Sequence, residues 1–254
     1  LADLGSLTFL STNGNRIEDL SPLSKLSRLT NLYCSNNQVT DISALANLIQ
    51  LQTLALTANR NPQTGRRLSN IRPMTKLKQM RTLKLGSNQI SDISALDRMT
   101  DLANLRLPYN QITDITALST LNQLRRLDLS HNRVSEIAVL ANIPGVTEWL
   151  DLTGNQIRNI KPLLDSLERV EGQLIPTYGV HALGKVWLNQ NPLDNVSVTY
   201  LLSQLKTSRI EVFYDALVPF DIIPISNPMI ETRLRAALKL SLGSDRGRAV
   251  SFRL

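Results

Sequence analysis

Asparagines recur at a nearly fixed interval along this 254-residue chain, and that spacing constrains its fold more than any other feature. Five of the seven intervals between successive members are 22 or 23 residues. Apolar residues stand eight, five and three positions earlier, as Leu29, Leu32 and Cys34 precede Asn37. A repeat of this length predicts coils that bury their apolar faces by stacking on their neighbours. The asparagines are Asn15, Asn37, Asn59, Asn88, Asn110, Asn132, Asn155 and Asn191.

The apolar spacing within each unit predicts one short strand. Two apolar residues two positions apart point to the same face of a strand, and the residues between them face solvent. The asparagine side chain carries two donors and an acceptor, so it can bond the backbone where the chain leaves the strand. An unpaired backbone group there would cost about 1–3 kcal/mol. We therefore expect the asparagines to form a ladder along the stack.

A second set of polar residues follows the asparagines. An acidic residue precedes a segment of leucines three apart, as Asp19 and Asp41 do, and such a residue is well placed to cap the free amides of a short turn. These leucine segments are too short for long helices and predict 3₁₀ turns or single helical turns. The carboxylates are thus expected to be structural. The equivalent positions elsewhere hold Asp92, Asp114, Glu136, Asn159 and Asn195.

Two interruptions break the period. Asn59 and Asn88 are 29 residues apart, and alignment of the flanking leucines assigns the extra residues to 60–67. Asn155 and Asn191 are 36 apart, which indicates a second insertion near 164–178. Insertions in repeat arrays map to surface loops. Helical spacing of the apolar residues 163, 164, 167 and 170 predicts a helix at the start of the second insertion.

The pattern predicts four parts of the chain. Residues 1–191 form the repeat array, and its opening leucines match the second half of a unit, so we expect further repeats upstream. Residues 192–214 close the array with a helix in which Tyr200, Leu201, Leu202 and Leu205 are apolar, and with a strand in which residues 210, 212 and 214 alternate with Glu211 and Phe213. Residues 215–228 contain three prolines and predict a linker. Residues 229–254 predict an amphipathic helix.

Residues 7–214 resemble the 22-residue class of leucine-rich repeats, which includes internalin-like and phosphatase-regulator-like proteins, with the consensus LxxLxLxxNxIxDIxxLxxL. This resemblance implies an α/β solenoid, shaped as a horseshoe or arc, with a parallel concave sheet and a convex side of short 3₁₀ or helical turns. The C-terminal features resemble those of bacterial members with several arrays. Residues 229–254 are similar to the cap that opens a following array, and the chain is then a fragment. A surface or extracellular location is implied by resemblance alone.

The family shares protein recognition on the concave sheet, so a partner site is expected among the outward residues of the strands. Both tryptophans of the chain fall in this set, and Trp, Tyr and Arg dominate binding hot spots. The alternative is that Trp149 and Trp187 only shield the irregular last units by stacking on each other. The predicted partner-binding residues are Tyr33, Lys84, Arg106, Tyr109, Arg126, Asp128, Trp149, Asp151, Lys185 and Trp187.

The formal net charge of +7 is concentrated near the first insertion, where no acidic residue occurs between Asp41 and Asp92. Such a patch attracts anionic polymers or acidic proteins, and the alternative is an ordinary solvated face. Nucleic acid is disfavoured as the ligand because no aromatic residues interleave with the basic ones. The patch consists of Arg60, Arg66, Arg67, Arg72, Lys76, Lys78, Arg81 and Lys84.

Motifs for chemistry are missing from the sequence. The single cysteine excludes an internal disulfide, and the two histidines have no Cys or carboxylate at metal-ligand spacing. Asp128 and Asp151 fall on adjacent strands and could pair as acid and base, but an open sheet offers no enclosed pocket. The sequence therefore predicts a non-enzymatic module without metal or cofactor that binds a protein. A structural spacer and a binder of anionic polymers remain as alternatives.

Overall fold

The computed structural model describes residues 4–143, 148–165, 167–170, 173–176, 184–203 and 210–215. The chain divides into two compact units, Leu1–Asp215 and Ala216–Leu254, and every described residue belongs to the first unit. The predicted linker, apart from Asp215, and the predicted amphipathic helix therefore lie outside the described residues, as does His181. None of the described helices is both long and apolar enough to cross a lipid bilayer.

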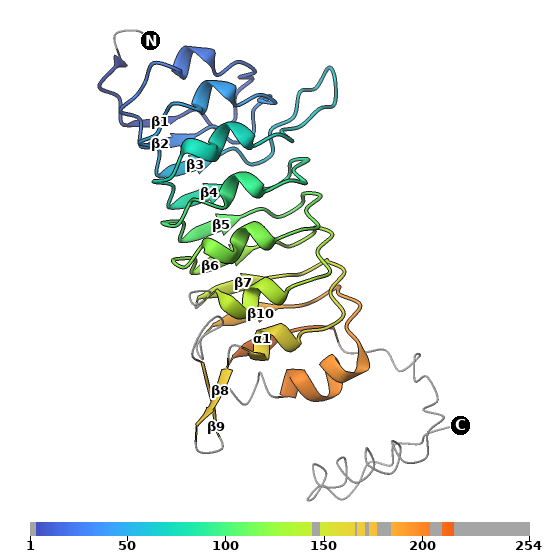
Figure 1. Ribbon diagram of the computed structural model, residues 1–254. Helices are drawn as coiled ribbons and strands as arrows, with labels where there is room; N and C mark the ends of the chain where they lie inside the picture. Colours follow the sequence, from blue (N-terminus) through green and yellow to red (C-terminus); the bar gives the residue numbers. More distant parts are fainter. Residues whose placement is uncertain are drawn as a thin grey trace, which may run out of the picture. The chain divides into compact units, whose positions relative to one another are not determined.

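The described strands of the repeat array build one sheet of nine, in which neighbours pair in parallel. They follow one another in sequence order, so each coil contributes one strand and lies on the coil before it (Figure 1). This confirms the predicted solenoid. The strands are β1 (Phe9–Ser11), β2 (Asn31–Tyr33), β3 (Thr53–Ala55), β4 (Thr82–Lys84), β5 (Asn104–Arg106), β6 (Arg126–Asp128), β7 (Trp149–Asp151), β10 (Lys185–Trp187) and β11 (Glu211–Phe213).

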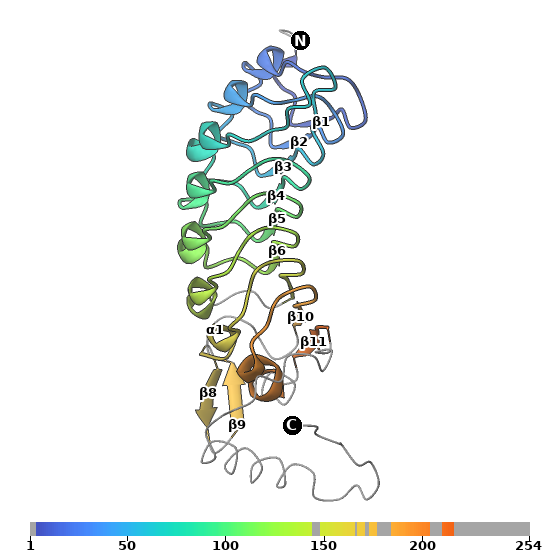
Figure 2. The ribbon, with the colours of Figure 1, turned by 90° about the vertical axis from the view of Figure 1, so that its right-hand side faces the viewer.

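Short helical turns occupy the side of each coil opposite the sheet (Figure 2). Most are 3₁₀ turns of three to five residues, as the tight leucine spacing predicts. They are η2 (Ser21–Leu23), η3 (Ser43–Leu45), η4 (Arg72–Lys76), η5 (Ser94–Leu96), η6 (Thr116–Thr120) and η7 (Ala138–Asn142), followed by the α-helix α1 (Lys161–Asp165) and the π-helical turn η8 (Ser197–Leu201).

The core lies between the sheet and the turns. The middle residue of each strand is buried from β2 to β10, and partners across strands are in register, as Leu32 is with Leu54 and Leu54 with Leu83. Cys34, just after β2, occupies a buried position that holds leucine in other coils, and burial raises the pKa of its thiol. The outward residues of the strands form what we call the sheet face, the surface that the sequence predicts as concave.

The asparagine ladder is present. The amide of Asn110 donates to the carbonyls of Leu107 in its own coil and Leu85 in the preceding coil, at 3.1 and 3.0 Å. Its Oδ1 accepts the Ile90 amide at 3.0 Å. Asn59, Asn132, Asn155 and Asn191 repeat this pattern, so each side chain ties two coils together. Asn15 differs because it is exposed and bonds only its own turn.

Most of the predicted caps are also present, but Glu136 accepts no capping hydrogen bond at η7 among the described residues. Oδ1 of Asp19 accepts the amide of Ser21, the first residue of η2, and the same contact recurs at Asp41, Asp92 and Asp114. Asn70 and Asn159 make it with amide oxygens. The prediction for Asn195 was wrong, because Asp194 accepts the Ser197 amide at 2.7 Å. The helical segment of this coil begins at residue 195, so the residue before it, Asp194, takes the capping position.

The first insertion forms a small hairpin in which Arg60 and Arg67 pair as an isolated antiparallel bridge. Oδ1 of Asn61 accepts the amides of Gln63 and Thr64, and Gly65 adopts a φ of 69°, as such a turn requires. The hairpin projects beside the turns that follow the strands in the neighbouring coils (Figure 1). In the buried part of the ladder, Asn88 is the one asparagine whose Oδ1 accepts no hydrogen bond from the described residues. The donor would come from the coil that carries the hairpin.

The second interruption differs from the sequence prediction. The helix α1 ends at Asp165, whereas residues 167–170 form strand β8 (Leu167–Val170), which pairs antiparallel with β9 (Gln173–Pro176). Only two residues separate these strands, a separation typical of hairpins, so local strand pairing overrides the helical spacing. In the closing helix, Leu202 is buried and Tyr200 is 55% exposed. Two residues along a helix turn the side chain by about 200°, so these two residues cannot share a face.

Candidate partner-binding surface

Six residues lie in register across the sheet face and form what we call the central row. The pairings join Lys84 to Arg106, Arg106 to Asp128, Asp128 to Asp151, Asp151 to Trp187, and Trp187 to Phe213. The row therefore passes from two cations through two carboxylates to two aromatic rings. Side chains on neighbouring parallel strands are separated by about 4.8 Å at the backbone, so each row member adjoins the next.

Aromatic and guanidinium groups form a continuous chain of contacts across the sheet face. The Arg106 guanidinium carbon lies 4.7 Å from the centroid of the Trp149 ring. The Trp149 and Trp187 rings contact each other with centroids 5.5 Å apart and planes at 58°, and Trp187 stacks on Phe213 at 5.0 Å and 10°. The two tryptophans thus contact each other, as the structural alternative predicts, but both rings remain partly exposed on the sheet face.

Two carboxylates lie side by side in the central row. Oδ1 of Asp128 accepts the amide and hydroxyl of Ser130 at 3.0 and 2.7 Å, and Oδ1 of Asp151 accepts the Thr153 amide at 2.9 Å. Burial raises the pKa of Asp128, and the neighbouring charge of Asp151 raises it further, while the Ser130 hydrogen bonds and Arg106 oppose this change. Among the described residues, neither carboxylate forms an ion pair.

The remaining charges near this row are paired. Arg126 Nε lies 2.6 Å from Glu148 Oε2, and Lys185 Nζ lies 2.9 Å from Glu211 Oε2. These pairs are largely exposed, so each contributes at most about 1 kcal/mol to stability. The two aspartates of the central row thus have no ion-pair partner among the described residues, whereas the acids beside them do.

Three polar atoms on this part of the sheet face are buried without a hydrogen-bond partner among the described residues. They are Asn104 Oδ1, Arg106 Nε and Trp149 Nε1, on β5 and β7. A buried polar atom left unpaired costs about 1–3 kcal/mol, and native proteins contain few such atoms. Their concentration around Arg106 and Trp149 indicates a surface whose hydrogen bonding is incomplete in the isolated chain.

The structure separates two predicted partner-binding residues from this group. Tyr33 lies on β2, which two strands separate from β5, and its ring contacts that of Phe9 at 5.5 Å. Tyr109 lies on the turn after β5, with a φ of 55°, and stacks on His131 at 4.2 Å and 12°. The residues that the structure brings together are Arg106, Asp128, Trp149, Asp151 and Trp187, with Lys84, Arg126 and Lys185 beside them.

The predicted basic patch is distributed around one coil. Arg60, Arg66 and Arg67 lie on the hairpin that follows β3, and Arg67 donates to the Ser87 carbonyl at 2.8 Å. Other members lie on or near the 3₁₀ turn η4, where Arg72 faces Asp92 at 3.4 Å, and Lys84 lies in the central row of the sheet face. Because the strand and the turn occupy opposite sides of a coil, these cations do not form one continuous face. The remaining members are Lys76, Lys78 and Arg81.

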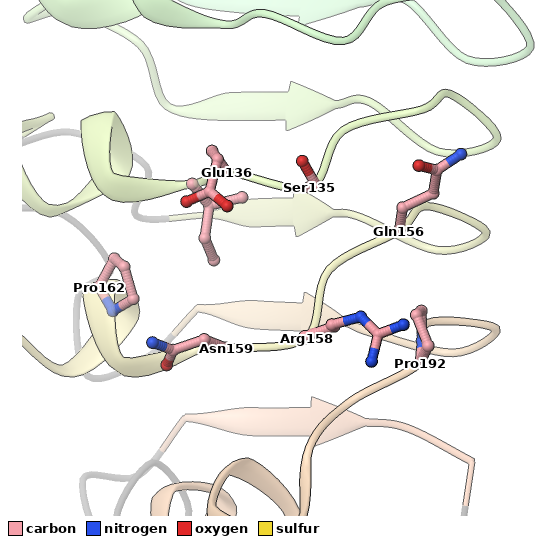
Figure 3. Close-up of a pocket in the computed structure, with 8 residues that line it drawn as sticks. Ser135, Glu136, Gln156, Arg158, Asn159, Pro162 and Pro192 are labelled. Carbon is pink, nitrogen blue, oxygen red and sulfur yellow. The ribbon is translucent and has the colours of Figure 1, made fainter.

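A shallow pocket of about 500 Å³ lies on the flank of the stack, where the chain passes from the ladder turns to the helical side (Figure 3). Its lining is mostly polar and exposed, with Glu136 and Arg158 contributed by successive coils. Ser135 is the potential nucleophile there, and the lining includes no histidine to activate it. Within the described part of the chain, no three His, Cys, Asp or Glu residues are grouped as metal ligands.

Sequence reasoning left Phe213 and Asn104 out of the site. Phe213 alternates with the inward residues Val212 and Tyr214, so the alternation did mark it as outward, and its stacking on Trp187 completes the aromatic chain. The register also marked Asn104 as outward, but its unpaired Oδ1 could not be predicted because it depends on where the neighbouring side chains point.

Comparison with known proteins supports the same architecture. A family model described as Leucine Rich repeats (2 copies) matches residues 27–65 and 100–142. The search of curated proteins found no match. Internalin C2 from Listeria monocytogenes is 28% identical with a TM-score of 0.66, and the match covers 84% of this chain and 83% of that one.

Two further solved structures share the fold at lower identity. A leucine-rich repeat protein from Leptospira interrogans is 23% identical with a TM-score of 0.64, covering 83% of this chain and 55% of that one. The ectodomain of an Arabidopsis thaliana membrane receptor kinase, solved in complex with CASPARIAN STRIP INTEGRITY FACTOR 2, is 24% identical with a TM-score of 0.59, covering 76% and 22%. The strand order, the ladder and these matches together show a leucine-rich repeat solenoid that is similar to internalin C2.

Proposed function

We propose that this chain is a non-catalytic module that binds a protein partner on the sheet face, centred on Arg106, Asp128, Trp149, Asp151 and Trp187. The leucine-rich repeat solenoid commonly mediates protein–protein interaction, and its stacked strands offer a long continuous surface for it. The resemblance to internalin-like arrays favours a location outside the cell or at its surface.

The observation that carries this proposal is the chain of contacts from Arg106 through Trp149 and Trp187 to Phe213, together with the unpaired polar atoms beside it. Partly exposed Trp and Arg side chains are the residues that most often dominate binding energy. A partner that covered them would remove their apolar surface from water. A purely structural spacer has no need of either feature.

Selection from a displayed library of random peptides tests the proposal. Ligands enriched on the wild-type chain are expected to lose at least about tenfold in affinity for Trp187→Ala, because truncation of a hot-spot aromatic removes 2 kcal/mol or more. Tyr200→Ala is the matched control, since Tyr200 is an exposed aromatic on the closing helix and away from the strands. Ligands that bind wild type and Trp187→Ala equally, with both variants folded, would refute a site on the sheet face.

A further inference from the structure

We propose that Asp128, Asp151 and Trp187 form a seat for one basic side chain, a lysine or an arginine, presented by the partner polypeptide. This inference rests on the proposed function and specifies the chemistry of the partner at the centre of the sheet face.

The first support is the geometry of the acid pair. Asp128 and Asp151 are register partners on β6 and β7, so their backbones are about 4.8 Å apart. Hydrogen bonds from residues 130 and 153 fix Oδ1 of each carboxylate. The second oxygen of each accepts no hydrogen bond from the described residues, which leaves two oxygens available to a donor in solvent.

The second support is the local charge balance. Two carboxylates at this separation repel each other, and burial increases the penalty for ionising Asp128. The nearest cation in the row, Arg106, has its guanidinium over Trp149 and forms no ion pair with the described acids. Arg106 offsets part of this repulsion, and a cation from a partner would relieve the rest.

The third support is the aromatic wall. Trp187 adjoins Asp151 in the central row, on the side away from Arg106. Indole faces attract ammonium and guanidinium groups, and the same surface already holds one such contact, between Arg106 and Trp149. A metal ion is a poorer occupant, because two carboxylates alone supply fewer ligands than Ca²⁺ takes. The chemistry therefore favours a Lys or Arg side chain.

Tryptophan emission provides the test, because Trp149 and Trp187 are the two tryptophans of the chain and both lie at the seat. The probes are end-blocked Gly-Lys-Gly and the same peptide with uncharged norleucine in place of lysine. The lysine peptide is expected to bind about tenfold more tightly to the wild-type chain, and this preference is expected to vanish in Asp128→Asn/Asp151→Asn. Equal responses to the two peptides, or no response to either, would overturn the inference.

Asp92→Asn/Asp114→Asn is the matched control. It makes the same chemical change and removes the same charge, but at caps on the helical side of the coils. Persistence of the preference for lysine in this control is expected, whereas its loss would assign the effect to net charge. This outcome can be distinguished from failure of the proposed function. If library ligands need Trp187 but bind the Asp128→Asn/Asp151→Asn variant normally, the binding site on the sheet face is supported and the seat is refuted.

Discussion

The Arg106 guanidinium lies over the Trp149 ring, 4.7 Å from its centroid, although strand β6 separates the strands that carry the two residues. The guanidinium therefore reaches diagonally across the sheet face instead of pairing with its register neighbour Asp128. This contact presents a cation–aromatic surface to a partner. It also leaves Asp128 and Asp151 without an ion-pair partner among the described residues. Fold and site are connected here, because the parallel register fixes which residues are neighbours.

The ladder predicts a graded response to removal of its asparagines. Asn110→Ala strands the Ile90 amide, and the free energy of unfolding is expected to fall by about 1–3 kcal/mol. The carbonyls of Leu85 and Leu107 keep hydrogen bonds from the side chains of Asn88 and Asn132. Asn88→Ala is expected to cost less because Oδ1 of Asn88 has no donor among the described residues. Asn15 is exposed, so Asn15→Ala is expected to change the free energy of unfolding by less than about 0.5 kcal/mol. Urea unfolding followed by circular dichroism measures all three, and equal losses would contradict the ladder.

Gly154 is expected to resist substitution for a steric reason. Its φ is 67°, and an added Cβ would lie 2.5 Å from Nδ1 of His131. Ala58 holds a comparable φ of 54° in another coil, so backbone conformation alone does not forbid alanine. Gly154→Ala is expected to lower stability by about 1–3 kcal/mol, and His131→Ala/Gly154→Ala to recover all but roughly 1 kcal/mol. Thermal melting measures this, and a double variant as unstable as the sum of the single ones would eliminate the clash.

The capping carboxylates predict a loss of stability in acid. The Ser94 hydroxyl and amide lower the pKa of Asp92, and the Thr116 amide and hydroxyl lower that of Asp114. The folded state then binds fewer protons than the unfolded state, so the caps stabilise above the ordinary carboxyl pKa, and this contribution disappears as pH falls through the lowered values. Asp92→Asn/Asp114→Asn keeps an acceptor but does not titrate. Its melting temperature is expected to lie below that of the wild type at neutral pH and to approach it below about pH 4. A constant difference across this range would contradict titrating caps.

The hairpin of the first insertion is expected to be dispensable for folding. Deletion of residues 61–67 joins Arg60 to Leu68 and restores the 22-residue interval before Asn88. The amide of Leu68 then takes the place that donates to the ladder asparagine in regular coils, as Ile90 does to Asn110. We expect the free energy of unfolding to change by less than about 1 kcal/mol, because longer surface loops add little closure entropy. Failure of the shortened chain to fold would show that the hairpin stabilises its coil.

Sequence alone predicted the strands, the ladder and most caps, because each is specified within one 22-residue unit. The placement of Asp128 and Asp151 on adjacent strands also followed from counting along the pattern. Contacts that depend on side-chain direction did not follow. Examples are the diagonal reach of Arg106 to Trp149 and the stacking of Tyr109 on His131, both of which join residues in different coils. Errors fell where the period breaks, at residues 167–170 and at Asp194, because there the pattern no longer fixes the register.

The most direct measurement of the central claim is a fluorescence titration of the wild-type chain with a ligand selected from the peptide library, compared with calorimetry of the same pair. Both tryptophans lie on the sheet face, so a partner that binds there must alter their environment. The account predicts a saturable change in emission whose dissociation constant equals the calorimetric one. Calorimetric binding without any change in emission would contradict it and assign recognition to another surface of the chain.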